Sequence, residues 1–183
     1  LAPTVTGAPA NGNSQTANFA FTGESGATYE CKLDSGSYVG CTSPFTVNNL
    51  TDGSHTVFIK QIDSLGNSDS GSIYSHSWLV DTVIPTATLR SIAANVNTRT
   101  LNYTVDFAET VSGVEVSDFV QASGTALCST STLTASAGTS ITFTVVCTRD
   151  GSLVMKLMPD SVSDQVGNLG PSLRVLSNST TVD

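Results

Sequence analysis

The chain has 183 residues, of which 15 are acidic and seven are basic, so its formal charge at pH 7 is −8. This acidic balance, with few and scattered cations, excludes the basic surface that binding to nucleic acid or to an anionic membrane requires. Its apolar runs are far shorter than the roughly 18 residues that a membrane-spanning helix needs. The length allows one domain or two small ones. Because the repeated patterns run to both ends, we expect the chain to be part of a longer protein.

Apolar and polar residues alternate with a period of two along much of the chain, and residues that favour helices are sparse. This alternation is typical of antiparallel strands with one face on a core and the other in water. The predicted strands are 17–22, 28–33, 57–62, 74–80, 101–107 and 141–148. The alternation breaks at Phe58 and Ile62, which indicates a central strand whose outer face is partly covered. Turn signals recur about every 8–12 residues, so the sequence predicts an all-β sandwich or barrel.

An internal repeat divides the chain. The Pro-Thr pair at 3–4 returns at 85–86, the Asp-x-x-Gly-Asn turn at 63–67 returns at 164–168, and the Val-Asp pair at 80–81 returns at 182–183. We therefore expect two domains, 1–82 and 83–183. The linker from Asp81 to Pro85 is short, and proline restricts both its own φ and the residue before it. The sequence therefore predicts a semi-rigid joint.

The four cysteines form one local pair in each predicted domain, Cys31 with Cys41 and Cys128 with Cys147. Three connectivities are possible; pairing within each domain is the simplest, and free thiols are an alternative. The chain has no C-x-x-C and no histidine beside either pair, which argues against a zinc site. Disulfides that close such short loops would each contribute roughly 3 kcal/mol and indicate an oxidising compartment. We therefore expect an exported protein, extracellular or at the cell surface.

Acidic and amide side chains offer two candidate calcium sites, since calcium takes about six to eight oxygen ligands. One group would converge at the joint between the domains and the other at one end of the second domain. The candidate ligands are Asp63, Asn67, Asp69 and Asp81 in the first group and Glu109, Asp118 and Asp164 in the second. The alternative is that each Asp-x-x-Gly-Asn aspartate braces its own turn. In that interpretation the bracing residues are Asp63, Gly66, Asn67, Asp164, Gly167 and Asn168. The absence of a D-x-D-x-D-G loop favours it.

No catalytic motif is present: the chain lacks G-x-S-x-G, H-E-x-x-H, a P-loop and G-x-G-x-x-G. His55 and His76 fall at regular repeat positions, where we expect packed or hydrogen-bonded side chains. Trp78 shares a strand face with other large residues, so we expect it in a core rather than on a sugar-binding surface. Tyr38 and Phe45 are better candidates for exposed aromatic residues. We therefore expect no enzymatic activity.

Several motifs keep the order found in a known group of repeats. They are YECKLD at 29–34, CTSP at 41–44, LTDGSHT at 50–56, IDSLGN at 62–67 and WLVDT at 78–82. Through them the first domain resembles bacterial immunoglobulin-like or fibronectin type III-like repeats of large surface and secreted proteins. The second domain resembles a related repeat of biofilm and adhesin proteins through FAETVSG at 107–113, SDF at 117–119 and the turn at 164–168. The resemblance implies two antiparallel immunoglobulin-like β-sandwiches in tandem and a bond between Cys31 and Cys41, whereas the second cysteine pair lies outside the pattern.

Such repeats usually act as spacers. The resemblance therefore implies non-catalytic stalk repeats of an exported bacterial adhesin or fibre protein that position a distal adhesive domain. The expected partners are neighbouring repeats of the same chain, and the only candidate cofactor is calcium. The isolated chain is expected to be a monomer. One alternative is a module that binds a glycan or protein of a host or prey cell through loops at a sandwich end. Another is an accessory region of a secreted polysaccharide-degrading enzyme.

Overall fold

The computed structural model describes residues 1–68, 71–93 and 95–183. Within this part of the chain all elements are strands except for one short 3-10 helix, so the all-β prediction is confirmed. The chain folds as two compact units, Leu1–Thr82 and Val83–Asp183, the division that the internal repeat predicts. Each unit has a hydrophobic core of its own.

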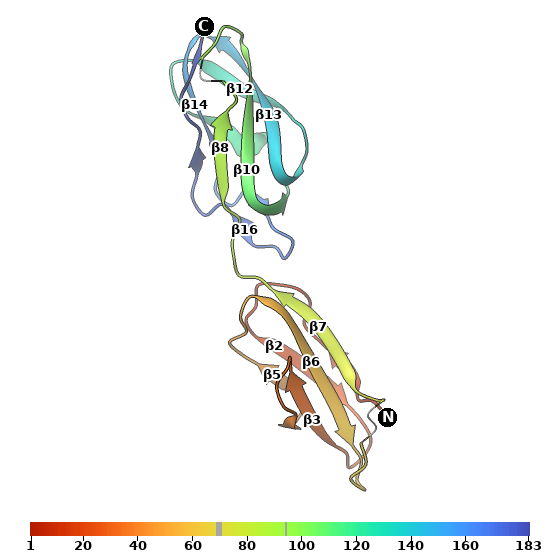
Figure 1. The fold of residues 1–183 in the computed structure, drawn as a ribbon. Helices are drawn as coiled ribbons and strands as arrows, with labels where there is room; N and C mark the ends of the chain where they lie inside the picture. The colour runs from red at the N-terminus through yellow and green to blue at the C-terminus, as the bar shows by residue number, and fades with distance from the viewer. Residues whose placement is uncertain (69–70, 94) are drawn as a thin grey trace. The chain divides into compact units, whose positions relative to one another are not determined.

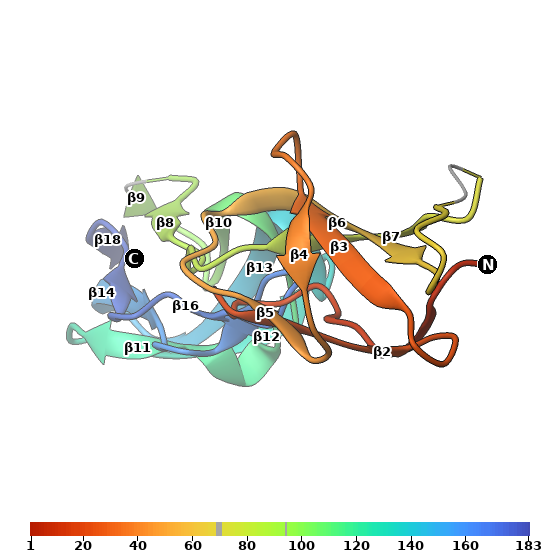
Figure 2. The same cartoon turned by 90° about the horizontal axis from the view of Figure 1, so that it is seen from below.

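The first unit is a sandwich of two antiparallel sheets, with strand orders β1-β2-β5 and β4-β3-β6-β7. Figure 2 shows β3, β6 and β7 in a layer above β2 and β5. The strands are β1 Thr4–Gly7, β2 Ala17–Thr22, β3 Thr28–Leu33, β4 Val39–Cys41, β5 Phe45–Val47, β6 Gly53–Ile62 and β7 Tyr74–Val80. The predicted strands 17–22, 28–33 and 74–80 are confirmed, and 57–62 forms the second part of the longer β6.

Alternating side chains of both sheets form the first core. Phe19 of β2 and Trp78 of β7 are both buried, and their rings meet edge to face with centroids 5.3 Å apart. Burying a side chain of this size stabilises the fold by roughly 2–3 kcal/mol. Trp78 therefore lies in the core, as its strand parity predicts.

The outer face of the larger sheet carries a self-contained cluster of aromatic and charged side chains. The Lys32 ammonium lies 4.1 Å from the ring centroid of Phe58 and 5.3 Å from that of Tyr38. Lys60 lies 4.5 Å from the Tyr38 ring and forms a 2.6 Å ion pair with Glu30. This cover explains why the alternation breaks at Phe58. Tyr38 is half-buried here, so the prediction of an exposed aromatic residue is wrong at this position.

Phe45, the second aromatic residue predicted to be exposed, is also half-buried and packs against the first core. It lies on β5, where it pairs with Phe19 of the neighbouring strand. The prediction failed because β5 has only three residues, too few for its alternation to identify a strand.

The chain enters the first unit at one end and leaves it at the other. At the entry, Thr4 pairs with Thr22 at the end of β2. Two residues further on, the Glu24 backbone N–H donates to the Gln61 side chain, so the entry lies near the end of β6. Val80, the last residue of β7, pairs instead with Gly53 at the start of β6. Because β6 has ten residues, these ends are about 30 Å apart. In Figure 1 the N-terminus accordingly lies near the start of β7, away from its arrowhead.

The second unit is also a sandwich of two sheets (Figure 1). One has the order β12-β13-β10-β15-β16 with β8 paired to β10, and the other has the order β11-β14-β18-β9 with β17 paired to β14. The elements are β8 Ala87–Ser91, β9 Asn95–Val96, β10 Thr100–Ser112, η1 Val116–Asp118, β11 Phe119–Ser123, β12 Leu127–Leu133, β13 Ala137–Arg149, β14 Gly151–Leu157, β15 Val162–Ser163, β16 Leu169–Gly170, β17 Val175–Leu176 and β18 Thr180–Val182. The predicted strands 101–107 and 141–148 lie in β10 and β13, which pair with each other.

The two sheets of the second unit meet through stacked aromatic rings. Phe119 of β11 and Phe143 of β13 stack with their centroids 4.1 Å apart, and Tyr103 of β10 stacks on Phe143 from the same sheet at 5.5 Å. The Tyr103 hydroxyl donates to the Thr180 hydroxyl at 3.1 Å. The aromatic core is therefore hydrogen-bonded to β18 across the sandwich.

Strand order identifies both sandwiches as immunoglobulin-like. In the second unit the main strands in chain order, A to G, are β8, β10, β11, β12, β13, β14 and β17–β18. They pair as A-B-E-D and C-F-G, the arrangement of immunoglobulin constant domains. In the first unit the fourth strand, β4, pairs with β3, so the sheets are A-B-E and C′-C-F-G. The prediction of immunoglobulin-like sandwiches is confirmed.

The chain also runs from end to end through the second unit. At the entry, the Asn168 side chain donates to the Val83 carbonyl at 3.1 Å, and Gly170 packs so closely on Pro85 that a Cβ would clash. This end lies next to the turn after β14, because the Asp160 amide donates to the carbonyl of residue 171. At the exit, Val182 pairs with the first residue of β14.

Candidate functional site

The two Asp-x-x-Gly-Asn turns are the best-defined polar sites. In the second unit the Asp164 Oδ1 atom accepts the backbone N–H groups of Val166, Gly167 and Asn168 at 2.8–2.9 Å. Its Oδ2 atom accepts the Asn168 side-chain amide at 2.7 Å. Gly167 has a φ of +94°, which favours glycine. Burial raises the pKa of Asp164, but these hydrogen bonds outweigh it, so the pKa is lowered.

The turn in the first unit repeats this arrangement nearer to solvent. The Asp63 Oδ1 atom accepts the Leu65 and Asn67 backbone N–H groups at 2.9 and 2.8 Å, and Oδ2 accepts the Asn67 side-chain amide at 3.1 Å. Gly66 has a φ of +87°. The hydrogen bonds from Asn67 lower the pKa of Asp63. Both aspartates thus brace their own turns.

The predicted convergence of calcium ligands in the first unit is wrong. Asp63 follows the last residue of β6, whereas Asp81 follows Val80, which pairs with the first residue of β6. The two carboxylates therefore lie at opposite ends of a ten-residue strand. Asp69 lies outside the described residues. Spacing along the sequence misled the prediction, because the intervening β7 carries the chain back across the length of the unit.

In the second unit the structure brings together two of the three predicted ligands. Carboxylate oxygens of Glu109 and Asp164 lie within 4.8 Å of each other. The Asp118 carboxylate instead accepts the Glu115 backbone N–H at 2.7 Å at the start of η1. Burial raises the pKa of Asp118. Calcium binding in this unit stays a prediction.

All four cysteines are bonded, and each bond lies within one sheet. Cys31 of β3 bonds to Cys41 of β4 with a Cα–Cα distance of 5.8 Å. Cys128 of β12 and Cys147 of β13 are directly opposite each other in the strand register, with a Cα–Cα distance of 4.0 Å. Antibody domains join their two sheets by a disulfide, whereas here each bond fastens an edge strand to its neighbour.

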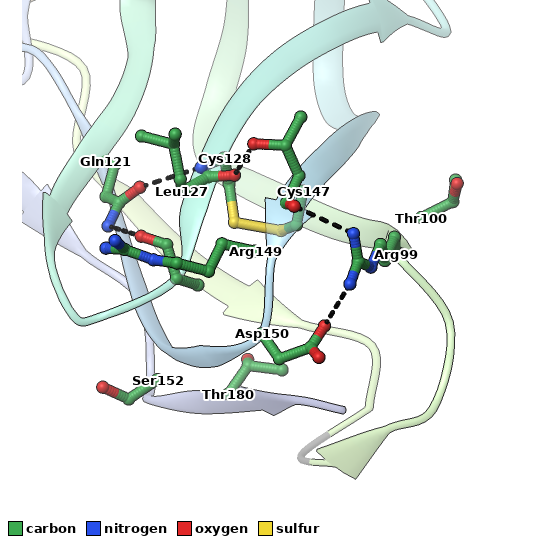
Figure 3. The surroundings of a disulfide bond; sticks show 12 residues. Arg99, Thr100, Gln121, Leu127, Cys128, Cys147, Arg149, Asp150, Ser152 and Thr180 are labelled. Atoms are coloured by element: carbon green, nitrogen blue, oxygen red, sulfur yellow. Dashed lines mark hydrogen bonds and ion pairs between the residues drawn. A yellow bond between two sulfur atoms is a disulfide. The ribbon is translucent and has the colours of Figure 1, made fainter.

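Side chains fix the turns around the second disulfide (Figure 3). The Gln121 side chain donates to the Ala126 carbonyl at 2.9 Å and accepts the Cys128 backbone N–H at 3.2 Å. The Arg149 guanidinium donates twice to the Thr125 carbonyl, at 2.9 and 2.6 Å. Together they hold the segment that crosses from β11 to β12. The sequence analysis missed this role, because no local motif marks it.

Both histidines are hydrogen-bonded within the first unit, as expected. His55 Nδ1 lies 2.9 Å from Asp34 Oδ2, and His55 Nε2 lies 2.8 Å from the Thr51 carbonyl. The hydrogen bond to Asp34 raises the pKa of His55. Burial opposes ionisation of Asp34, but its hydrogen bonds to His55 and to the Thr56 N–H lower its pKa overall. His76 Nε2 lies 2.7 Å from the Pro9 carbonyl.

No helix among the described residues has the length and apolar character needed to cross a membrane. No family model and no curated protein matches the chain. Among solved structures, the chain is similar to the D00-D0 domain of Intimin, with 14% identity, 99% of both chains covered and a TM-score of 0.40. It is similar to fibronectin(III)-like modules of Clostridium thermocellum CbhA, with 14% identity, coverage of 98% of this chain and 91% of that chain, and a TM-score of 0.36. It is also similar to the BSP domain of a biofilm-associated protein, with 15% identity, coverage of 99% and 29%, and a TM-score of 0.28. At these TM-scores the likeness adds nothing to what the strand order establishes.

Proposed function

We propose that the chain is a non-catalytic spacer region of an exported bacterial surface protein, an adhesin or a fibre. In such a protein, sandwiches in series hold a distal adhesive domain away from the cell. The observation that carries the proposal is the path of the chain through each unit. In each unit the chain enters at one end of the sheets and leaves at the opposite end. A module threaded in this way adds its full strand length to a stalk.

The disulfides support both the location and the mechanical role. Each unit contains one bond, and such bonds persist in oxidising compartments outside the cytosol. Because each bond fastens an edge strand, it protects the part of a sandwich that frays most easily or pairs with other chains. The charge of −8 further discourages association between copies.

The arrangement of the polar side chains supports a role without catalysis. Both histidines, the most common general bases, are engaged with backbone carbonyls of their own unit. The two turn aspartates use their oxygens to accept hydrogen bonds from their own turns. These groups therefore contribute to stability rather than to proton transfer.

Small-angle X-ray scattering of the whole chain tests the proposal. A compact particle of this length has a radius of gyration of about 16 Å. Two sandwiches in series, about 30 Å and about 40 Å long as judged from their ten-residue and thirteen-residue strands, would give about 22 Å or more. We expect a monomer with the larger value. A value near 16 Å would overturn the spacer proposal.

A further inference from the structure

A surface hollow of about 620 Å³ lies in the second unit, beside the turn after β14 and the segment before β17. Its size lies within the range of about 300–1,000 Å³ that is typical of ligand sites. Its lining residues are Lys156, Met158, Pro159, Ser172, Leu173 and Arg174. Neither the spacer role nor the sequence motifs account for it.

The charge of this hollow is unusual for the molecule. The other three cations of the second unit, Arg90, Arg99 and Arg149, are bonded to a carboxylate or carbonyl oxygen. Within the described part of the chain, Lys156 and Arg174 have no ion pair or hydrogen bond of this kind. Two uncompensated positive charges on an acidic protein therefore meet at one place, which favours an anionic ligand.

Exposed apolar side chains flank these charges. Val120, Lys156 and Leu176 are register partners on β11, β14 and β17, so they form a row across the outer face of the sheet. Leu173 is 77% exposed and Leu176 is 49% exposed. Large apolar side chains grouped on the surface around a hollow are typical of interaction sites. A ligand that fits this surface would therefore combine negative charge with apolar groups.

The backbone beside the hollow is open as well. In the described structure, the main-chain groups of residues 172–174 make no hydrogen bond, and these residues are exposed. An extended peptide could pair with them as an added strand and place alternate side chains toward the hollow. None of the lining residues is aromatic, so a sugar ring would find no flat surface on which to stack.

We propose that this hollow is a docking site for an extended, acidic segment of a partner protein in which carboxylates alternate with apolar side chains. Lys156 and Arg174 would bind the carboxylates, and Leu173 and Leu176 would contact the apolar side chains. The second unit would then be both a spacer and a recognition module.

The test uses the full chain and a fluorescent ten-residue peptide in which Asp alternates with Leu. Fluorescence anisotropy measures the dissociation constant of this peptide and of a matched peptide with Asn in place of Asp. We expect saturable binding of the acidic peptide, weakened about tenfold in K156Q/R174Q and several-fold in L173S. Raising the salt concentration should weaken binding further.

Matched variants separate the site from general effects. R90Q removes an exposed cation that is paired to Asp106; both residues lie in the sheet that does not line the hollow. L65S removes a leucine that is 85% exposed in the first unit. Both should bind the acidic peptide like the unmodified chain. Equal loss in these controls, equal binding of the Asn peptide, or no binding up to 1 mM would overturn the proposal. Preferred binding of tetragalacturonate, or self-association that K156Q/R174Q abolishes, would replace the proposed partner by a glycan or by a second copy of the chain.

Discussion

The two units share one architecture and differ in the sheet that their fourth strand joins. In the first unit β4 turns back on β3, whereas in the second unit β12 crosses over to pair with β13. The disulfide of each unit involves this strand, joining Cys41 to Cys31 in one and Cys128 to Cys147 in the other. The comparison indicates that the bond fixes the most variable strand of the sandwich in its sheet.

The segments that lead into these strands differ accordingly. In the first unit Asp34 has a φ of +50°, and its carboxylate accepts the Thr56 backbone N–H and contacts His55 Nδ1. These bonds fix a tight hairpin between β3 and β4. In the second unit Gly124, with a φ of +117°, packs against the Ser152 carbonyl, where a Cβ would clash. The chain can therefore leave β11 and cross to the opposite sheet.

Removing each disulfide should have the largest effect. The variants C31S/C41S and C128S/C147S should each lose roughly 3 kcal/mol of unfolding free energy, because the stabilisation depends only on the logarithm of the number of residues in the closed loop. Denaturant titration followed by Trp78 fluorescence reports on the first unit, since Trp78 is the only tryptophan. Hydrogen exchange should show that protection is lost first in β4 and β12. Protection lost evenly over each unit would contradict the role assigned to the bonds.

The two turn aspartates should differ in proportion to their burial. D164A should lower the stability of the second unit by about 2–3 kcal/mol, because buried N–H groups lose their acceptor. D63A should have a smaller effect, since its turn is nearer to solvent. Circular dichroism melting of the two variants makes the comparison. Equal losses would show that burial does not determine the strength of this motif.

Between pH 5 and 9, changing the pH should alter the stability of the first unit only, because the second unit contains no histidine. Because the pKa of His55 is raised, its pairing with Asp34 stabilises the fold fully below about pH 6.5 and is lost as the pH rises through the raised value. The lowered pKa of Asp34 means that its contribution is lost as the pH falls below about 4. Asp34 is 41% exposed, so the effect should stay below about 1 kcal/mol.

Melting of the first unit, followed by Trp78 fluorescence from pH 5 to 9, measures this effect. H55Q should remove the decline, and the second unit, which contains no histidine, is the internal reference. A parallel decline in both units would count against the His55–Asp34 pair as its cause.

Calcium should have the smallest effect. The Asp164 oxygens already accept four hydrogen bonds from the turn, so we expect melting curves of the second unit with excess calcium and with chelator to agree within about 1 °C. A rise of several degrees that E109Q abolishes would instead make Glu109 and Asp164 ligands.

Local patterns predicted the strands, the burial of Trp78 and the cysteine pairs, because alternation and short separations act within a few residues. They failed where strand pairing determines which residues lie close together in space. Asp63 and Asp81 were grouped by proximity in sequence, although β7 separates them by the length of the unit. Lys156 and Arg174 are far apart in sequence and meet only because β17 pairs with β14. The sequence likewise did not predict which sheet the fourth strand joins, because this depends on the conformation of the turn that precedes the strand.

Single-molecule force spectroscopy tests the central claim most directly: the chain contains two sandwiches threaded end to end, each with its fourth strand fixed by a disulfide. Pulling on the termini should give two separate unfolding steps. Reduction should lengthen one step by about 30 Å and the other by about 60 Å, since the bonds enclose 10 and 19 residues of sequence separation and already span Cα–Cα distances of 5.8 and 4.0 Å. A single cooperative step, or step lengths that reduction leaves unchanged, would contradict the account.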